Sequence, residues 1–266
     1  MSDTGQLSSD AAEVYDELFL PALFGSWPPR LVAAAQLHPG MRVVDVACGT
    51  GVLAIEAACV TAPDGVVVGV DLNPGMLAVA RRKAPELEWI QARAEALPLQ
   101  TASFDAALSQ FGLMFFENKE AAVAEMWRVL RPGGRLVIAV WDSLENAPGY
   151  AAVTSLLARL FGDAIAALLR APYSLGDLGE LRSLLRAAGV TDFEVRRHAG
   201  EARFPSIASW IETDVRGWTL SNRLDEEQCA LLASECEREL SHFVTPDGTV
   251  RFAHPALVAT ATKRPC

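Results

Sequence analysis

The segment between residues 43 and 54 constrains this chain more than any other. Its sequence, Val-Val-Asp-Val-Ala-Cys-Gly-Thr-Gly-Val-Leu-Ala, is an apolar run that breaks at Gly49 and Gly51 and continues into a helical pattern. Glycine tolerates a positive φ angle and lets a ligand lie against the backbone, and a helix that begins there offers unpaired N–H groups. The segment therefore predicts a strand, a tight turn and a helix around a ligand site.

Two acidic residues narrow the choice of ligand. Asp71 ends the next apolar run, 20 residues beyond Gly51, which is the spacing at which an acidic side chain meets ribose hydroxyls. The pattern Gly49-x-Gly51-x-x-Ala54 also satisfies the dinucleotide fingerprint, so the glycines alone predict only an adenosine-containing cofactor. Asp45 would crowd a pyrophosphate but suits a cationic amino group. It favours a cofactor with an amino-acid tail.

Five ordered motifs across residues 43–141 resemble those of class I S-adenosylmethionine-dependent methyltransferases. After the first segment come Asp71-Leu-Asn-Pro-Gly-Met-Leu77, Ala94-Glu-Ala-Leu-Pro98 with Ser103-Phe-Asp-Ala106, Ser109-Gln-Phe-Gly-Leu-Met-Phe-Phe116, and Arg128-Val-Leu-Arg-Pro-Gly-Gly134 with Arg135-Leu-Val-Ile-Ala-Val-Trp141. In particular, the chain resembles the small-molecule group that includes the ubiquinone/menaquinone C-methyltransferases, the type 11-like methyltransferases. Outside this block the likeness thins.

The resemblance implies a cofactor site with S-adenosylmethionine as cofactor. Asp71 would hold both ribose hydroxyls, and Leu72 and Met76 would flank the adenine. The implied cofactor-binding residues are Asp45, Ala47, Gly49, Thr50, Gly51, Asp71, Leu72, Met76, Ala94, Glu95, Gln110 and Phe111.

Position 93 departs from the family pattern. Arg93 stands where family members commonly carry an aspartate that accepts the adenine amino hydrogens, and arginine has only donors. Either a backbone carbonyl or Glu95 takes over this role, or the Ala94 N–H and apolar stacking hold the adenine. Arg93 is therefore left out of the predicted site.

Alternating strand and helix patterns predict an α/β fold, a Rossmann-like, doubly wound, seven-stranded sheet. Strands are expected at about 42–47, 66–71, 87–91, 104–109, 134–141, 192–197 and 256–262. The resemblance implies that strand seven is antiparallel. The expected organisation is an N-terminal helical extension (1–40), a cofactor-binding core (41–141), a cap insertion (142–177), a core helix with strand six (178–198), a second cap insertion (199–248) and strand seven with a tail (249–266).

Both insertions leave the carboxyl ends of their strands, where ligands bind in open parallel sheets. They contain aromatic residues such as Tyr150, Phe161, Trp218 and Phe243. We expect them, with the N-terminal helices, to cap an acceptor, and peripheral packing or a dimer surface is the alternative. The side chains expected to contact the acceptor are Phe24, Trp27, Met114, Phe115, Trp141, Tyr173 and Trp210.

Methyl transfer from a sulfonium requires the protein mainly to align the reactants, exclude water and, in some cases, remove a proton. The candidate catalytic residues are His198 and His254, expected at the functional edge of the sheet, because imidazole titrates near neutrality. Tyr15 is a third candidate, because an N-terminal tyrosine of related enzymes often closes over the methionine moiety. A rim position without chemistry is the alternative for each histidine. His38 and His242 are expected to be structural or solvated.

Charge and cysteine usage exclude several classes. A net charge of −10 argues against nucleic acid as substrate, and the cluster Arg81-Arg82-Lys83 suits a solvated helix end. No 18-residue apolar stretch occurs, so no membrane span is expected, and the start of the chain has no secretory signal pattern. Five scattered cysteines, Cys266 among them, favour free thiols in a reducing cytoplasm, without a metal site.

These observations predict a cytoplasmic S-adenosylmethionine-dependent methyltransferase, monomeric or homodimeric. Its expected acceptor is a small or medium, largely apolar organic molecule of biosynthetic or secondary metabolism. Methylation of carbon, oxygen or nitrogen stays open. The alternatives are an S-adenosylmethionine-binding enzyme of the same fold with a non-methylating reaction, an NAD-dependent oxidoreductase, or a non-catalytic regulator that binds S-adenosylmethionine.

Overall fold

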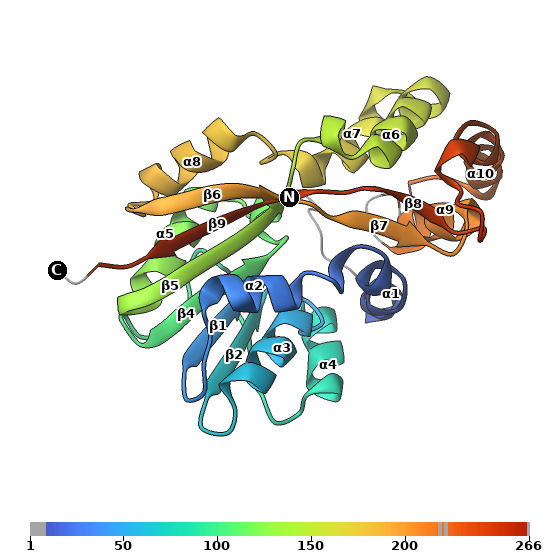
Figure 1. The fold of residues 1–266 in the computed structure, drawn as a ribbon. Helices are drawn as coiled ribbons and strands as arrows, with labels where there is room; N and C mark the ends of the chain where they lie inside the picture. The colour runs from blue at the N-terminus through green and yellow to red at the C-terminus, as the bar shows by residue number, and fades with distance from the viewer. Residues whose placement is uncertain (1–8, 218–219, 221–222, 265–266) are drawn as a thin grey trace.

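The computed structural model describes residues 9–217, 220 and 223–264 and is built around a seven-stranded sheet (Figure 1). Trp218 and Cys266 lie outside the described residues. Within that part of the chain, no helix is long and apolar enough to cross a membrane. The sheet strands are β1 (Arg42–Val46), β2 (Val66–Asp71), β3 (Glu88–Gln91), β4 (Phe104–Gln110), β5 (Leu130–Trp141), β6 (Phe193–His198) and β9 (Ala256–Thr262).

The strand order is β3-β2-β1-β4-β5-β9-β6. Neighbouring strands from β3 to β5 are parallel, whereas β9 runs antiparallel to both β5 and β6. The doubly wound sheet with an antiparallel seventh strand is confirmed. Trp141 and His198 both pair with Ala256, so the carboxyl ends of β5 and β6 lie at one edge.

Strand β5 begins earlier than the sequence predicted. Leu130 pairs with Phe104 before an irregularity, and regular pairing resumes at Arg135 opposite Ala106. The Arg-Pro-Gly-Gly turn therefore interrupts a strand that has already started.

Helices cover both faces of the sheet. Helices α2 (Pro28–Ala35), α3 (Val52–Thr61) and α4 (Pro74–Lys83) lie on one face, and α5 (Lys119–Val129) and α8 (Leu178–Ala187) pack together on the other (Figure 1). The central strands β1 and β4 are therefore buried over almost their whole length. Such two-sided burial explains why they appear in the sequence as continuous apolar runs.

A second group of elements, which we call the outer layer, lies beyond the carboxyl edge of the sheet (Figure 1). It comprises η3 (Leu144–Asn146), α6 (Pro148–Phe161), α7 (Asp163–Arg170), η4 (Ala171–Tyr173), β7 (Glu201–Phe204), α9 (Ile207–Gly217), α10 (Glu226–Glu239), η5 (Ser241–Phe243) and β8 (Val250–Ala253). The antiparallel pair β7–β8 was not predicted. It continues the β6 and β9 segments past the edge of the main sheet, so two strand connections link both sheets.

The N-terminal segment packs between the core and the outer layer. Helix α1 (Ser9–Val14) runs into the π-helix η1 (Tyr15–Phe24), and both contact α9. Arg82 and Lys83, at the end of α4, pair with Glu13 and Asp16 of this segment, each at 2.7 Å. Two of the three residues in the basic cluster thus attach the N-terminal segment to the core.

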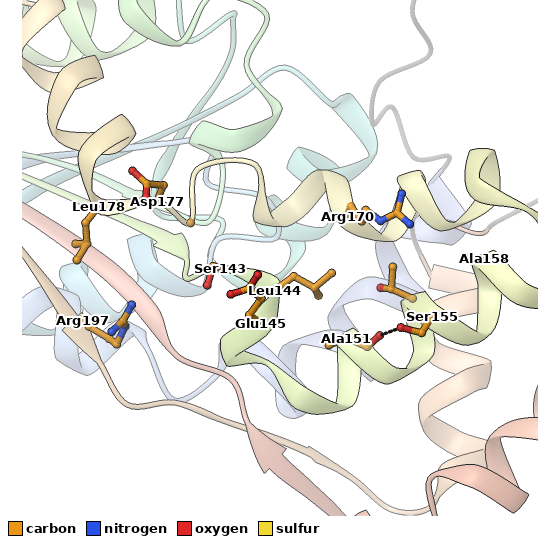
Figure 2. Close-up of a pocket in the computed structure, with 12 residues that line it drawn as sticks. Ser143, Leu144, Glu145, Ala151, Ser155, Ala158, Arg170, Asp177, Leu178 and Arg197 are labelled. Atoms are coloured by element: carbon orange, nitrogen blue, oxygen red, sulfur yellow. Dashed lines mark hydrogen bonds between the residues drawn. The ribbon is translucent and has the colours of Figure 1, made fainter.

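A groove of about 840 Å³ separates the outer layer from α8 (Figure 2). Ser143 and Glu145 contribute from the loop after β5, Ser155 from α6, and Arg170 and Arg197 from opposite ends. None of the residues predicted for the cofactor or the acceptor lines this groove. It is therefore a feature separate from the predicted site.

Candidate functional site

The candidate site lies where the sheet changes winding direction, between the adjacent strands β1 and β4. The connections after these strands go to opposite faces, which opens a crevice at their carboxyl ends. The loops that follow both contain strained backbone, with φ of +59° at Ala47 and +55° at Phe111. A Cβ on Gly112 would lie 2.5 Å from the Cβ of Ala47, so the two loops touch. Strain of this kind clusters at functional sites.

The glycine loop after β1 is built for close approach. Gly49 and Gly51 have φ angles of +53° and +86°. A Cβ on Gly51 would lie 2.5 Å from the ring of Trp89, whereas one on Gly49 would meet nothing within 4 Å. Helix α3 starts after Gly51 without a side-chain cap, so its first N–H groups stay available to a ligand. Gly51 thus lets the loop pack directly against Trp89, and the side of the loop at Gly49 stays open to a ligand.

Asp71 is positioned by the glycine loop itself. One carboxylate oxygen accepts the N–H of Gly49 and the other accepts the N–H of Asn73, each at 2.8 Å. Asn73 in turn caps α4 by accepting the N–H of Gly75 at 2.8 Å. Burial raises the pKa of Asp71, and the amide hydrogen bonds oppose the rise. The carboxylate is therefore held beside the loop, as a ribose-binding residue requires.

Asp45 is a buried carboxyl group that lacks a hydrogen-bond partner. Its side chain is 1% exposed, and neither oxygen has a partner among the described residues. Burial and the nearby charge of Asp71 raise its pKa to about 8, although the amide of Ala54 is near enough to lower it in part. An orphaned carboxyl group in this place fits the amino group of an amino-acid tail and does not fit a phosphate.

The adenine side of the predicted site is formed by the ends of β2 and β3. Leu72 is 41% exposed, unusual for leucine, while Ala94 is buried. Glu95 accepts the N–H groups of the next loop at residues 117 and 118, at 3.1 and 3.3 Å. Arg93 pairs with Glu117 at 2.7 Å. Both charged side chains are thus engaged with the neighbouring loop, which favours the backbone and apolar stacking for adenine.

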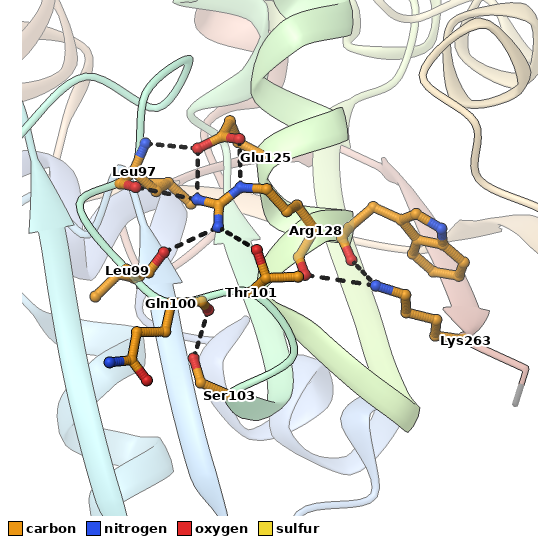
Figure 3. Close-up of polar contacts among 9 residues, drawn as sticks. Leu97, Leu99, Gln100, Thr101, Ser103, Glu125, Arg128 and Lys263 are labelled. Atoms are coloured by element: carbon orange, nitrogen blue, oxygen red, sulfur yellow. Dashed lines mark hydrogen bonds and ion pairs between the residues drawn. The ribbon is translucent and has the colours of Figure 1, made fainter. Parts of the chain in front are cut away.

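Helix α5 holds the segment that follows Ala94 in place (Figure 3). Arg128 donates to the carbonyls of Leu97 and Leu99, at 3.1 and 2.9 Å, and pairs with Glu125. Glu125 also accepts the N–H of Leu97 at 2.9 Å. Lys263 donates to the carbonyl of Trp127 in the same helix at 2.7 Å and to that of Leu130, at the start of β5, at 2.8 Å. The adenine side of the site therefore rests on a dense set of hydrogen bonds.

Three further polar atoms near the strand ends are buried without a partner among the described residues. They are the hydroxyls of Thr50 and Ser109 and the side-chain carbonyl of Gln110. Thr50 and Gln110 were predicted, whereas Ser109 was not assigned a role. A buried polar group without a partner is costly, so these atoms mark positions that a ligand or water would satisfy.

Tyr15 faces the same crevice from the N-terminal segment. Burial raises its pKa, and the carboxylates of Asp71 and Asp45 both add to the rise. Its ring lies 5.2 Å from that of Phe24, centre to centre. The structure therefore brings Tyr15 next to both predicted acidic residues.

A row of aromatic rings runs from this point into the outer layer. Phe111 and Trp141 stack at 3.6 Å, and Trp141 and His254 stack at 3.9 Å. Phe24 and Trp27 pack against this row, at 5.6 and 5.4 Å from Phe111. Four predicted site residues from the N-terminal segment and from the ends of β4 and β5 thus meet one of the predicted catalytic histidines.

The two predicted histidines differ in environment. His254 is 2% exposed, its Nε2 lies 2.9 Å from the Tyr173 hydroxyl, and its Nδ1 has no partner among the described residues. Burial lowers its pKa to about 3. His198 is half-buried at the end of β6, and burial with the charges of two arginines lowers its pKa. His254 is the one that contacts the aromatic row.

Met114 and Phe115 form η2 (Leu113–Phe115), which contacts η4 of the outer layer. Met114 is buried and Phe115 is half-buried. Trp210 lies farther out, stacked with Phe204 at 5.5 Å and 4.6 Å from Phe252. Met114 and Phe115 are therefore near the site, and Trp210 belongs to the centre of the outer layer.

Sequence reasoning missed one buried polar pair. The Tyr150 hydroxyl donates to Asp214 at 3.2 Å, and Asp214 is 3% exposed. Burial raises the pKa of Asp214 to about 7. The available signal was the position of Asp214, four residues after Trp210 on the apolar face of α9, where a carboxyl group is unusual.

Comparisons with known proteins agree with this geometry. Residues 44–138 match the model of the methyltransferase domain family. The demethylmenaquinone methyltransferase of Thermus thermophilus is 42% identical over 137 residues, which are 49% of this chain and 62% of that protein. The match thus spans less than two thirds of that relative's length. The uncharacterized protein Mb1440c of Mycobacterium bovis is 30% identical over 89% of this chain and 86% of its own length.

A likeness among solved structures extends over more of the chain. The phosphoethanolamine N-methyltransferase 2 of Haemonchus contortus, solved with S-adenosyl-L-methionine, has a TM-score of 0.64 and covers 98% of this chain and 58% of its own. At 18% identity this likeness concerns the fold alone. The matched domain model, the similarity to the mycobacterial protein over most of its length, and the arrangement of Asp45, Gly49 and Asp71 at the ends of β1 and β2 agree with this fold. The chain belongs to the methyltransferase-domain family, whose class I members use S-adenosylmethionine, as its ordered motifs predicted.

Proposed function

We propose that this protein transfers a methyl group from S-adenosylmethionine to a small or medium, largely apolar organic acceptor. The observation that carries the proposal is the cradle formed by Asp45, the open front of Gly49 and the fixed carboxylate of Asp71. These groups match an amino-acid tail at one end and a ribose at the other.

When bound, the cofactor supplies an activated methyl group through its sulfonium. The residues of the chain bind and orient it: Asp71 holds the ribose hydroxyls, Asp45 pairs with the amino group, and Leu72 packs on the adenine, with Met76 and Ala94 alongside. Tyr15 covers the tail from the N-terminal segment. Because the leaving group is already activated, this alignment accounts for most of the work of catalysis.

We assign the acceptor to the end of the aromatic row that meets the outer layer. Phe111 and Trp141 form an apolar wall there, and His254 supplies the nearest titratable group. Because burial lowers its pKa, His254 is neutral and a weak base at physiological pH. In the tautomer whose Nε2–H donates to the Tyr173 hydroxyl, its Nδ1 would accept a hydrogen bond from the acceptor. Tyr173 holds its other nitrogen. The outer layer then acts as a cap that excludes water.

Composition supports proposals about the class of acceptor and the cellular compartment. A net charge of −10 supports an acceptor that is not a nucleic acid. The scattered cysteines support a reducing, cytoplasmic setting. We propose a monomer or a homodimer.

Calorimetry with S-adenosylhomocysteine tests the cofactor assignment. The unmodified protein should bind it with a micromolar Kd, and Asp71→Ala should abolish the binding. The matched control is Asp163→Ala, which removes an exposed carboxylate that pairs with Arg170 and should leave the Kd unchanged. An unchanged affinity in Asp71→Ala would remove the ribose assignment. Mass spectrometry of candidate acceptors should then detect a gain of one methyl group, and its absence would favour a non-methylating reaction.

A further inference from the structure

Asp45 has a property that methyl transfer does not by itself require. It is a carboxyl group within β1, one of the two central strands of the sheet, and is 1% exposed, with both oxygens unpartnered among the described residues. An ionised carboxylate in such a place is expensive unless a cation or several donors accompany it. No ion pair involving Asp45 occurs in the described part of the chain. The free protein therefore has a strong physical reason to keep this group neutral.

The groups that face Asp45 also favour its neutral form. Asp71, at the end of β2, is a second carboxylate whose charge acts on Asp45. Tyr15 from η1 and Cys48 from the following loop also face it, and each has a pKa raised in part by Asp45. The cation whose charge reaches Cys48, Arg81, donates instead to the carbonyl of Trp89 at 3.0 Å. Among the described residues, only the backbone N–H of Ala54 favours ionisation of Asp45.

These surroundings give Asp45 a pKa of about 8. At pH 7 such a group would be about nine-tenths protonated, because the ratio of acid to base changes tenfold per pH unit. The amino group of an amino-acid tail is positively charged at this pH, with an ordinary pKa of roughly 8. A cation placed beside the carboxyl group removes the penalty for ionisation.

We propose that Asp45 is protonated in the free protein and releases its proton when the amino group of the cofactor binds, so that cofactor binding at neutral pH is coupled to the loss of one proton. This inference rests on the proposed function and concerns how the same site selects its ligand. The O–H bond of the Asp45 carboxyl group breaks, the proton passes to solvent, and the resulting carboxylate pairs with the ammonium group. No electron transfer is involved.

The coupling makes the amino group part of the recognition. A nucleoside without the amino-acid tail offers no cation to Asp45 and leaves its proton in place. For a ligand with the tail, affinity should rise about tenfold between pH 6 and pH 7, because one proton leaves per ligand bound.

Calorimetry in buffers of different ionisation enthalpy measures the released protons directly. At pH 7, S-adenosylhomocysteine should release about 0.8 proton per site, because Asp45 loses about 0.9 proton and the amino group gains about 0.1. The release is read from the difference in heat between phosphate and Tris. The matched ligand control is 5′-methylthioadenosine, which keeps the adenine and the ribose but lacks the tail. It should release less than about 0.2 proton, and because it occupies the ribose site it also reports any proton lost from Asp71.

The variant Asp45→Asn, an uncharged group of the same shape, should bind S-adenosylhomocysteine with no net proton release at pH 7. Should that variant fail to fold, a pH titration of the carboxyl carbon resonances in the unmodified protein replaces it. One carboxyl group should titrate near pH 8 in the free protein and below pH 6 when S-adenosylhomocysteine is bound.

Three results would overturn the inference. S-adenosylhomocysteine binding with less than about 0.2 proton released, equal release with both nucleosides, or an unchanged release in Asp45→Asn would each show that Asp45 is not the source. These results leave the proposed function intact. Failure of both nucleosides to bind at millimolar concentration would instead overturn the proposed function and this inference together.

Discussion

The backbone of Gly51 has a φ of +86°, and a Cβ at this position would lie 2.5 Å from the ring of Trp89. Gly51→Ala should therefore lower the free energy of unfolding by about 3 kcal/mol, the sum of left-handed strain and a clash in a packed interior. Gly40→Ala is the matched control, because Gly40 has a φ of +84° with nothing within 4 Å of the Cβ position. It should cost about 1 kcal/mol. Equal losses in urea unfolding would contradict this account of Gly51.

The sequence predicts the position of some site residues, whereas the contacts of others become known only from the three-dimensional fold. The spacing of Asp71 from Gly51 predicts a carboxylate beside the glycine loop, where the structure has it, because the strand–helix–strand unit fixes the distance between them. The sequence cannot show that both Asp45 oxygens lack a hydrogen-bond partner among the described residues, because this depends on the side chains that pack on both faces of β1. The contact between His254 and Tyr173 joins residues 81 positions apart, and no local pattern connects them.

Arg128 illustrates how one side chain supports a whole element. It donates to two carbonyls after β3 and to Glu125. Arg238 is 62% exposed, and in the described part of the chain it pairs only with Glu235 and Glu239 of its own helix. Arg128→Met should lower the free energy of unfolding by about 2 kcal/mol, because two part-buried carbonyls lose their donors. Arg238→Met should change it by less than about 0.5 kcal/mol. Chemical denaturation of both variants measures the difference, and equal effects would sink the interpretation.

The elements of the core were predictable because they combine strong periodicity with defined turns. The continuous apolar runs of β1, β2 and β4 and the glycine turns between them locate the parallel sheet. The pair β7–β8 was missed because each strand has only four residues and the two are separated by residues 205–249, which include α9, α10 and η5. Their pairing follows from that of β6 and β9, because β7 comes directly after β6 and β8 comes directly before β9.

The N-terminal segment depends on two contacts with α4 that differ in exposure. The Arg82 and Glu13 side chains are 60% and 53% exposed, against 30% and 23% for Lys83 and Asp16. Lys83→Met should therefore loosen this segment more than Arg82→Met, because the less exposed pair is less screened. Faster amide hydrogen exchange in residues 12–24 should accompany Lys83→Met only. Equal exchange in both variants would contradict this ranking.

At the scale of the whole molecule, buried ionisable groups set the pH dependence of stability. Asp45 and Asp214 have folded-state pKa values of about 8 and about 7, raised mainly by burial above their ordinary range. A raised carboxyl pKa means that the folded state binds protons more tightly than the unfolded chain, so stability falls as pH rises towards these values. His254, with a pKa lowered to about 3, acts in the opposite direction only below about pH 6.5.

The free energy of unfolding should therefore fall by on the order of 2 kcal/mol between pH 6.5 and pH 8, and level off above about pH 9. Asp45→Asn should remove more than half of this fall, because Asp45 has the higher pKa. Urea unfolding at a series of pH values measures both effects. Stability that stays constant across this interval would show that the two carboxyl groups are already ionised in the folded protein.

The central claim is that the cradle at the ends of β1 and β2 holds a sulfonium nucleoside. A crystal structure of the protein with S-adenosylhomocysteine tests it most directly. The account predicts the ribose hydroxyls on Asp71, the amino group facing Asp45 and the sulfur directed towards Phe111 at the start of the aromatic row. A nucleoside bound elsewhere, or an amino-acid tail turned away from Asp45, would contradict it.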